Sequence, residues 1–237
     1  MPKRYWYVIL TYVIMQASAF VFAPLLYILT PLGQVDASIY WSIFSFLAAL
    51  VLVLWLMRPD IKAPAHPQAS PVWEVILWGI AGLCMAYFAN TIASVIETTV
   101  FGINPSSQNT QQIMEITRTV PLFAVITALV APILEEIIFR KIIFGGLYKR
   151  MNFFFAAALS ALIFGLIHGE PEHILVYASM GFVFAFLYVQ TKRIIVPIIV
   201  HMALNTLSVI VQLSLDPEDL EKMMQELDHI QTILIGG

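Results

Sequence analysis

The chain has 237 residues, of which 60% are hydrophobic and only 11% are charged, with a formal net charge of −3. No polar stretch is long enough to build the core of a soluble domain, and the negative balance argues against nucleic acid as a partner. Repeated apolar runs of about 20 residues predict a polytopic, all-α integral membrane protein whose partner is the lipid bilayer. The single cysteine, Cys84, excludes an intrachain disulfide and a cysteine metal cluster.

Seven apolar runs predict seven transmembrane helices within a single membrane domain over 1–237. In chain order they cover residues 5–29, 38–57, 72–100, 121–148, 153–168, 173–189 and 194–213. The first run is too long for the core of a signal peptide and is expected to be a retained helix. The second half of the polar segment 102–119 is expected to form a short helix at the membrane interface. The tail 216–234 carries an apolar stripe and is predicted to be an amphipathic helix.

Lysine and arginine are distributed unevenly between the predicted loops. With a cytoplasmic N-terminus, nine basic residues lie on the inner side of the membrane: Lys3, Arg4, Arg58, Lys62, Lys141, Lys149, Arg150, Lys192 and Arg193. Only Arg118 and Lys222 then lie outside, and such a bias is typical of this orientation. The count requires the run 153–168 to cross fully. At 1.5 Å per residue that run measures about 24 Å against a hydrocarbon core of ~30 Å, so a re-entrant helix stays open as the alternative.

The run 121–148 carries three charged residues at membrane depth. Charges there are costly, so they usually mark a function and have a partner. Glu136 and Arg140 are four residues apart and are predicted to form an ion pair on one helix face. Glu135 is turned about 100° away on an α-helix and is expected to face a polar cavity. Pro132 is expected to leave the carbonyl of Ala128 without its helical partner.

Two further polar groups lie in apolar runs. His168 ends the run 153–168, and the spacing of His201 and Asn205 places both on one face of the run 194–213. A carboxylate and a histidine together can hold and deprotonate a water molecule. A second histidine and an amide can donate hydrogen bonds to an oxyanion. These residue types therefore predict the hydrolysis of an amide bond.

The chain resembles the CPBP family, which comprises CAAX-type prenyl endopeptidases and their bacterial bacteriocin-processing and immunity relatives. The resemblance covers roughly 121–213, within the motif-bearing core 120–213. It lies in three motifs in the family's order: Glu135-Glu136-x-x-x-Arg140, Phe164-x-x-x-His168 and His201-x-x-x-Asn205. It implies an all-helical, glutamate-dependent intramembrane endopeptidase in a bacterial plasma membrane, acting on a membrane-associated peptide or protein.

By the same resemblance, each motif residue receives a role. Glu135 and His168 are expected to activate water, and His201 and Asn205 to stabilise the oxyanion. Glu136 and Arg140 are expected to be a structural ion pair.

Metal dependence separates two versions of this prediction. The family is commonly labelled as metalloprotease, and His168, His201 and Glu135 would supply a zinc site with one open position. The HExxH pattern of soluble zinc proteases is absent, however, and the amide of Asn205 is a poor zinc ligand. We therefore favour a mechanism without a cofactor, with zinc as the alternative.

The same residue types also occur in membrane proteins of other classes. Intramembrane acids and histidines also build proton relays, so a proton-coupled transporter is one alternative, although no internal repeat supports it. A membrane scaffold or regulator that binds peptides without cutting them is another. Glu170 and Glu172, close to His168, are expected to be solvated loop charges, and His173 has no predicted role.

Overall fold

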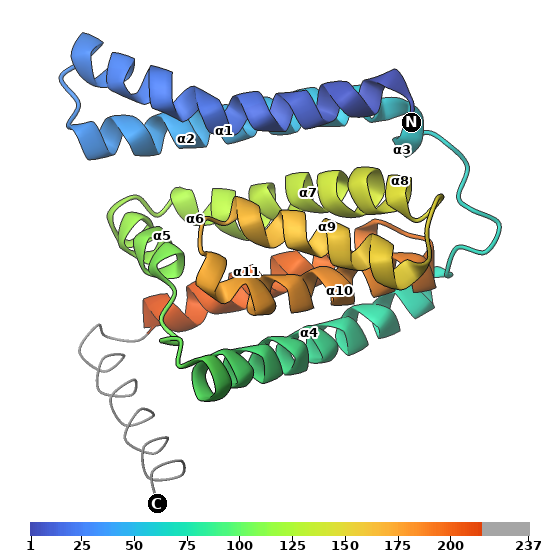
Figure 1. Ribbon diagram of the computed structural model, residues 1–237. Helices are drawn as coiled ribbons and strands as arrows, with labels where there is room; N and C mark the ends of the chain where they lie inside the picture. Colours follow the sequence, from blue (N-terminus) through green and yellow to red (C-terminus); the bar gives the residue numbers. More distant parts are fainter. Residues whose placement is uncertain (215–237) are drawn as a thin grey trace, which may run out of the picture.

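The computed structural model describes residues 1–214, and these residues form helices and connecting loops without a strand (Figure 1). The amphipathic helix predicted over 216–234 lies outside the described residues. Five helices are long and apolar enough to cross a membrane: α1 (Lys3–Leu29), α2 (Gln34–Leu56), α4 (Val72–Phe101), α10 (Ile174–Thr191) and α11 (Ile195–Ser214). The apolar helix α9 (Phe153–Ile167) is shorter. The predicted class, an all-α polytopic membrane protein, is confirmed.

The run predicted as one helix over 121–148 is a continuous rod with two π-helical stretches. Its parts are α6 (Phe123–Val125), η1 (Ile126–Val130), α7 (Ala131–Glu135), η2 (Glu136–Phe144) and α8 (Gly145–Leu147). Stretches of π-helix are rare and occur frequently at functional sites. A uniform α-helix is therefore the wrong description of the segment that carries the charged motif.

The remaining elements are short. They are α3 (Arg58–Ile61), α5 (Gln108–Thr119) and the 3₁₀ turn η3 (Pro171–His173). In α5 the Ser107 side chain caps the first turn by accepting the Thr110 N–H at 3.0 Å. The helix α2 begins at Gln34, earlier than predicted, because Gly33 is extended at the N-cap and Asp36 favours the first turn.

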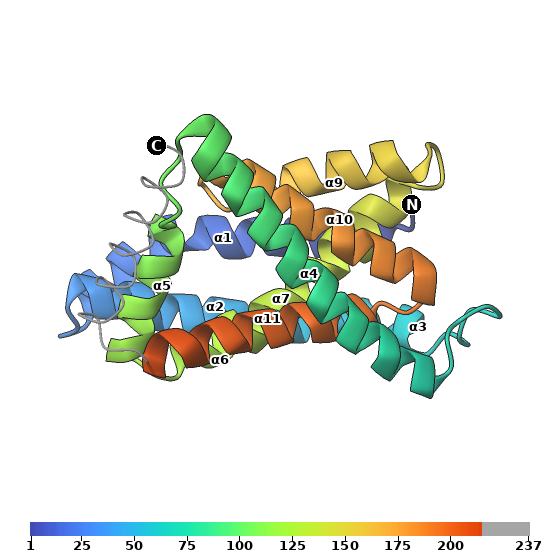
Figure 2. The ribbon, with the colours of Figure 1, turned by 90° about the horizontal axis from the view of Figure 1, so that it is seen from below.

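The rod lies in the middle of the molecule. The antiparallel pair α1–α2 covers one side of it, and α9, α10 and α11 lie on the other, with α4 crossing them obliquely (Figures 1 and 2). Buried side chains of α1, α2 and the rod form one apolar core, which includes Val8, Ile39, Val53, Leu134 and Phe139. Helices α9 and α10 approach closely, because a Cβ on Gly181 would lie 2.5 Å from the Cβ of Ala161. Small residues commonly permit such contacts between membrane helices.

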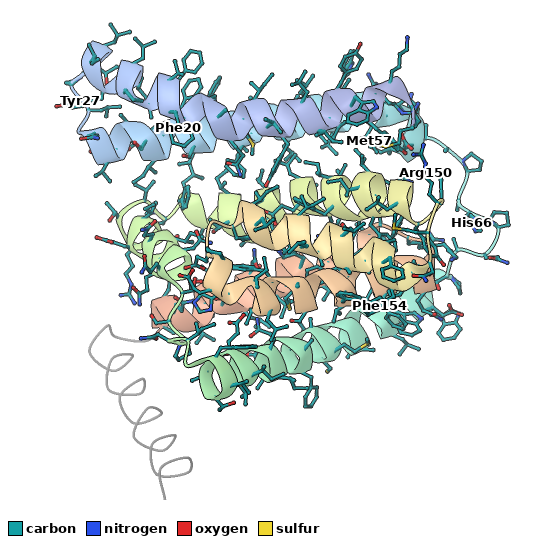
Figure 3. All side chains as sticks on the ribbon, viewed as in Figure 1. Phe20, Tyr27, Met57, His66, Arg150 and Phe154 are labelled. Carbon is teal, nitrogen blue, oxygen red and sulfur yellow. The ribbon has the colours of Figure 1, made fainter. Side chains whose placement is uncertain are left out.

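The loops separate to the two ends of the bundle. The N-terminus, α3, the loop with His66 and the turn with Arg150 lie at one end, and α5 with the α9–α10 connection lies at the other (Figures 1 and 3). Apolar side chains cover the outer helix faces between these ends. Phe20 is 85% exposed and Phe154 is 62% exposed, as expected of surfaces that contact lipid.

Candidate active site

The π-helical register of the rod determines which carbonyl lacks a backbone partner. The N–H of Ala131 bonds to the carbonyl of Ile126, five residues back. In the same register the carbonyl of Thr127 faces Pro132, which has no N–H. The prediction that Pro132 frees the Ala128 carbonyl assumed α-helical spacing, whereas in the π register the carbonyl opposite Pro132 is that of Thr127.

Asn205 supplies the missing donor. Its side-chain nitrogen donates to the Thr127 carbonyl at 2.9 Å and so connects α11 to η1. A backbone carbonyl at membrane depth needs such a partner, since no bulk water is present to solvate it. One of the two amide hydrogens predicted to serve an oxyanion is thus used to hold two helices together.

Glu136 and Arg140 form the predicted pair inside the protein. Their side chains are 0% and 1% exposed, and Arg140 Nε lies 3.1 Å from Glu136 Oε2. The contact is an ion pair without hydrogen-bond geometry, and none of the three Arg140 nitrogen atoms has a hydrogen-bond partner among the described residues. The guanidinium carbon instead lies 4.5 Å from the ring centre of Phe164 and 5.0 Å from that of Phe184. The negative faces of two rings therefore supplement a single carboxylate.

His201 lies between the two adjacent glutamates. Its Nδ1 donates to Glu136 Oε1 at 2.9 Å, and its Nε2 lies 3.7 Å from Glu135 Oε2. Its ring stacks on Phe184 at 4.9 Å between centroids. Glu136 therefore does more than pair with Arg140, because it also orients the imidazole that faces Glu135.

The two glutamates differ in their access to solvent. The Glu135 side chain is 13% exposed, whereas Glu136 is completely buried. Glu135 Oε2 lies 3.7 Å from His201 Nε2, while the Glu136 carboxylate contacts both His201 and Arg140 within 3.1 Å. Glu135 is thus the carboxylate of the pair that a reactant can approach.

His168 is the C-cap residue of α9. Its Nδ1 donates to the Phe164 carbonyl at 2.7 Å, which leaves Nε2 with the lone pair when the ring is neutral. The centroids of the His168 and Phe164 rings are 4.5 Å apart, and those of Phe164 and His201 are 6.2 Å apart. Both imidazoles therefore flank one phenylalanine, and their separation is smaller than the sum of these two distances.

Glu97, Glu170 and His173, which lie outside the motifs, are also buried and hydrogen-bonded. Glu170 is 6% exposed and accepts from Ser107 and from the backbone of Asn109, so the prediction of a solvated loop charge is wrong for it. His173, to which no role was given, is buried, and its Nδ1 donates to Glu97 at 2.9 Å. Glu97 could have been noticed in the sequence, because it is an acid within the apolar run 72–100.

Neither of the two hollows on the surface of the described residues lies at the motif residues. Two surface hollows, of about 450 and 500 Å³, are lined by residues other than the motif residues, so the water-filled cavity at Glu135 stays a prediction. Among the described residues, no three His, Cys, Asp or Glu side chains are placed to hold a metal ion. Metal dependence, with His168, His201 and Glu135 as the alternative zinc set, therefore stays a prediction, and we derive no step through zinc.

The fold and the site define a class, an integral membrane protein with a buried Glu–Arg–His cluster. The family model described as "Type II CAAX prenyl endopeptidase Rce1-like" matches residues 117–207. The chain is 45% identical to the Bacillus subtilis protein named "Putative membrane peptidase YdiL", over 100% of this chain and 99% of the relative. It is 34% identical to the "Membrane-embedded CAAX protease MroQ" of Staphylococcus aureus, over 98% of this chain and 99% of that protein. No solved structure matches the chain.

The chain belongs to the Rce1-like CAAX protease family and is a membrane peptidase, as the three motifs predicted. The two bacterial relatives, which the chain matches over 99% of their length, are both named as peptidases or proteases. The assignment as a membrane peptidase therefore replaces the alternatives of a proton-coupled transporter and a peptide-binding scaffold.

Proposed function

We propose that the chain is a glutamate-dependent intramembrane endopeptidase that hydrolyses a peptide bond in a membrane-associated peptide or protein. The observation that carries this proposal is the position of His201 between two glutamates, of which only Glu135 is partly exposed. An accessible carboxylate beside an oriented imidazole is suited to move a proton to and from a reacting group.

The proposed reaction begins with one water molecule. Glu135, assisted by the free Nε2 of His168, takes a proton from the water, whose oxygen bonds to the carbonyl carbon of the scissile peptide. The electron pair of the C=O π bond moves to the carbonyl oxygen and gives a tetrahedral oxyanion. When this intermediate collapses, the C–N bond breaks and the amine leaves with the proton that Glu135 had taken.

His201 and Asn205 are proposed to stabilise the oxyanion. Asn205 keeps a second amide hydrogen beyond the one that it donates to Thr127. His201 uses Nδ1 for Glu136, so in this role it donates from Nε2 as an imidazolium. Donors that are held in place before the reaction stabilise developing charge without reorganisation.

The proposal is tested with purified protein in lipid nanodiscs and a library of membrane-associated peptides, with products identified by mass spectrometry. We expect Glu135→Gln to abolish cleavage and to leave the unfolding temperature unchanged, because the amide keeps the volume of the side chain and loses the base. Glu115→Gln, in an exposed part of α5, is the matched control and should cleave normally. Full activity in Glu135→Gln would show that the assignment of the base is wrong.

The same preparation tests the metal-free version of the mechanism. We expect elemental analysis of the active protein to find no stoichiometric zinc, and chelation to leave the cleavage rate unchanged. Stoichiometric zinc whose removal and return switch cleavage off and on would contradict this version and leave the assignment of a protease intact.

A further inference from the structure

Tyr177, at the end of the first turn of α10, lies flat against the candidate base His168. The two ring centroids are 4.2 Å apart and the ring planes are inclined by 26°. Phe164 contacts the same imidazole at 4.5 Å with an interplanar angle of 63°. The imidazole is therefore enclosed by two aromatic rings, and only Phe164 belongs to a family motif of the sequence.

The hydroxyl of Tyr177 is fixed by Glu170. It donates to Glu170 Oε2 at 2.8 Å, and the same carboxylate accepts from Ser107 Oγ at 2.7 Å and from the Asn109 N–H at 2.9 Å. Burial by itself raises the pKa of the Glu170 carboxyl, but these hydrogen bonds outweigh it and hold the pKa below its usual range. The tyrosine thus donates to a carboxylate that is charged at neutral pH.

The backbone on which Tyr177 stands is held from two sides. Glu97, from α4, accepts the N–H groups of Leu175 and Val176 at 2.9 and 3.1 Å, so it caps the start of α10. On the other side Gly165 allows α10 to approach α9, since a Cβ there would lie 3.3 Å from the Cβ of Tyr177. The ring position of Tyr177 is therefore determined by helix packing.

His168 needs such support because of its place in the chain. It is the C-cap residue of α9, and the next residue, Gly169, has a positive φ of 75°, so no helix continues beyond it. Its hydrogen bond to the Phe164 carbonyl fixes which nitrogen carries the proton only while the ring keeps this orientation. A ring stacked on one face supplies that constraint.

We propose that Tyr177 is a positioning residue that holds His168 in the tautomer with the proton on Nδ1 and the lone pair on Nε2. For its catalytic consequence this inference rests on the proposed function. It extends the site to a residue that the motifs do not include, and it connects α5 to the candidate base through Glu170.

The first test measures the tautomer directly and needs no substrate. The chain has five histidines, so a histidine-selective ¹⁵N spectrum of the full-length protein in nanodiscs is simple, and His168→Gln identifies the signal. We expect one tautomer for His168 in the wild type and in Tyr177→Phe, which keeps the stacked ring. In Tyr177→Leu we expect a mixture of the two tautomers. Tyr188→Leu, which removes a different ring from α10, should leave the signal unchanged.

The second test uses the cleavage assay. We expect Tyr177→Leu to lower kcat by about 10- to 100-fold with KM within about 2-fold, since small misplacements of a catalytic group have effects of this size. Tyr177→Phe should recover most of the rate. An unchanged His168 signal in Tyr177→Leu, with or without a change in kcat, would overturn the inference. Failure of the wild type to cleave any peptide would count against the proposed function alone.

Discussion

At the scale of single residues, two adjacent glutamates receive different tasks from their surroundings. Glu136 is buried against Arg140 and His201, whereas Glu135 keeps part of its side chain exposed. Paired carboxylates with unlike environments commonly divide the chemistry of an active site in this way. The sequence predicts the division through helical geometry, but it did not indicate that Glu136 also binds the imidazole.

Removal of one charge from the buried pair should destabilise the protein. We expect Glu136→Gln and Arg140→Leu each to lower the free energy of unfolding by about 3–5 kcal/mol, because each leaves an uncompensated charge. The double variant should recover much of this loss, since no unpaired charge then remains. Denaturant unfolding of the four proteins in micelles measures the coupling. Strictly additive effects would show that the two charges do not stabilise each other.

At the scale of the element, the rod is the part of the fold that the sequence described least well. The apolar run and its ends are visible in the sequence, and so is Pro132. The choice of a π register is not visible, because it depends on whether another helix offers a donor to the carbonyl left free. Asn205 offers it to Thr127 from α11, about 80 residues along the chain.

Asn205 and Pro132 should therefore be coupled. Asn205→Leu leaves the Thr127 carbonyl without a partner, and we expect it to lower the free energy of unfolding by about 1–3 kcal/mol. Adding Pro132→Ala supplies a backbone N–H in the same register and should restore stability. It should not restore cleavage, because the proposed oxyanion donor is still missing. Recovery of both stability and cleavage would show that Asn205 acts only by holding the helices together.

The attachment of α5 should depend on pH through Glu170. The pKa of Glu170 is lowered in the folded protein, so its stabilising effect is present above the ordinary glutamate pKa of about 4.5 that it has in the unfolded chain. That effect is lost as the pH falls through the lower folded value. We expect thermal unfolding temperatures of wild type and Glu170→Gln to differ most near neutral pH and to converge as the pH falls through the lowered folded pKa of Glu170. A difference that grows on acidification would contradict this assignment.

At the scale of the whole molecule, the helical connections give two chemically different ends. Composition and hydropathy were sufficient to predict the class of fold and nearly all helices, because lipid demands long apolar helices with satisfied backbones. The buried contacts of Glu97, Glu170 and His173 were missed for the opposite reason. Each joins parts of the chain that are distant in sequence or lie in loops, where no periodic pattern marks a partner.

The basic end of the bundle is predicted to face the cytoplasm. The chain has one cysteine, so the test begins from a Cys84→Ser background. We expect His66→Cys in that background to react with an impermeant maleimide only in inside-out vesicles, and Asn104→Cys to react in intact cells. His66 lies in the connection from α3 to α4 and Asn104 in that from α4 to α5, and these two connections lie at opposite ends of the bundle (Figure 1). Labelling of His66→Cys in intact cells would reverse the predicted orientation.

The π-helical register also has a consequence for how the chain tolerates changes of length. Each π turn accommodates about one residue more than an α turn, so deletion of one residue from Ile126–Val130 would let the rod relax into ordinary α-helix. The residues beyond the deletion would then keep nearly the same rotational position relative to α11, and Glu135 would still face His201. The same deletion within the α-helical turn Ala131–Glu135 would instead rotate the residues beyond it by about 100°. We therefore expect cleavage to tolerate a single-residue deletion in Ile126–Val130 better than one in Ala131–Glu135.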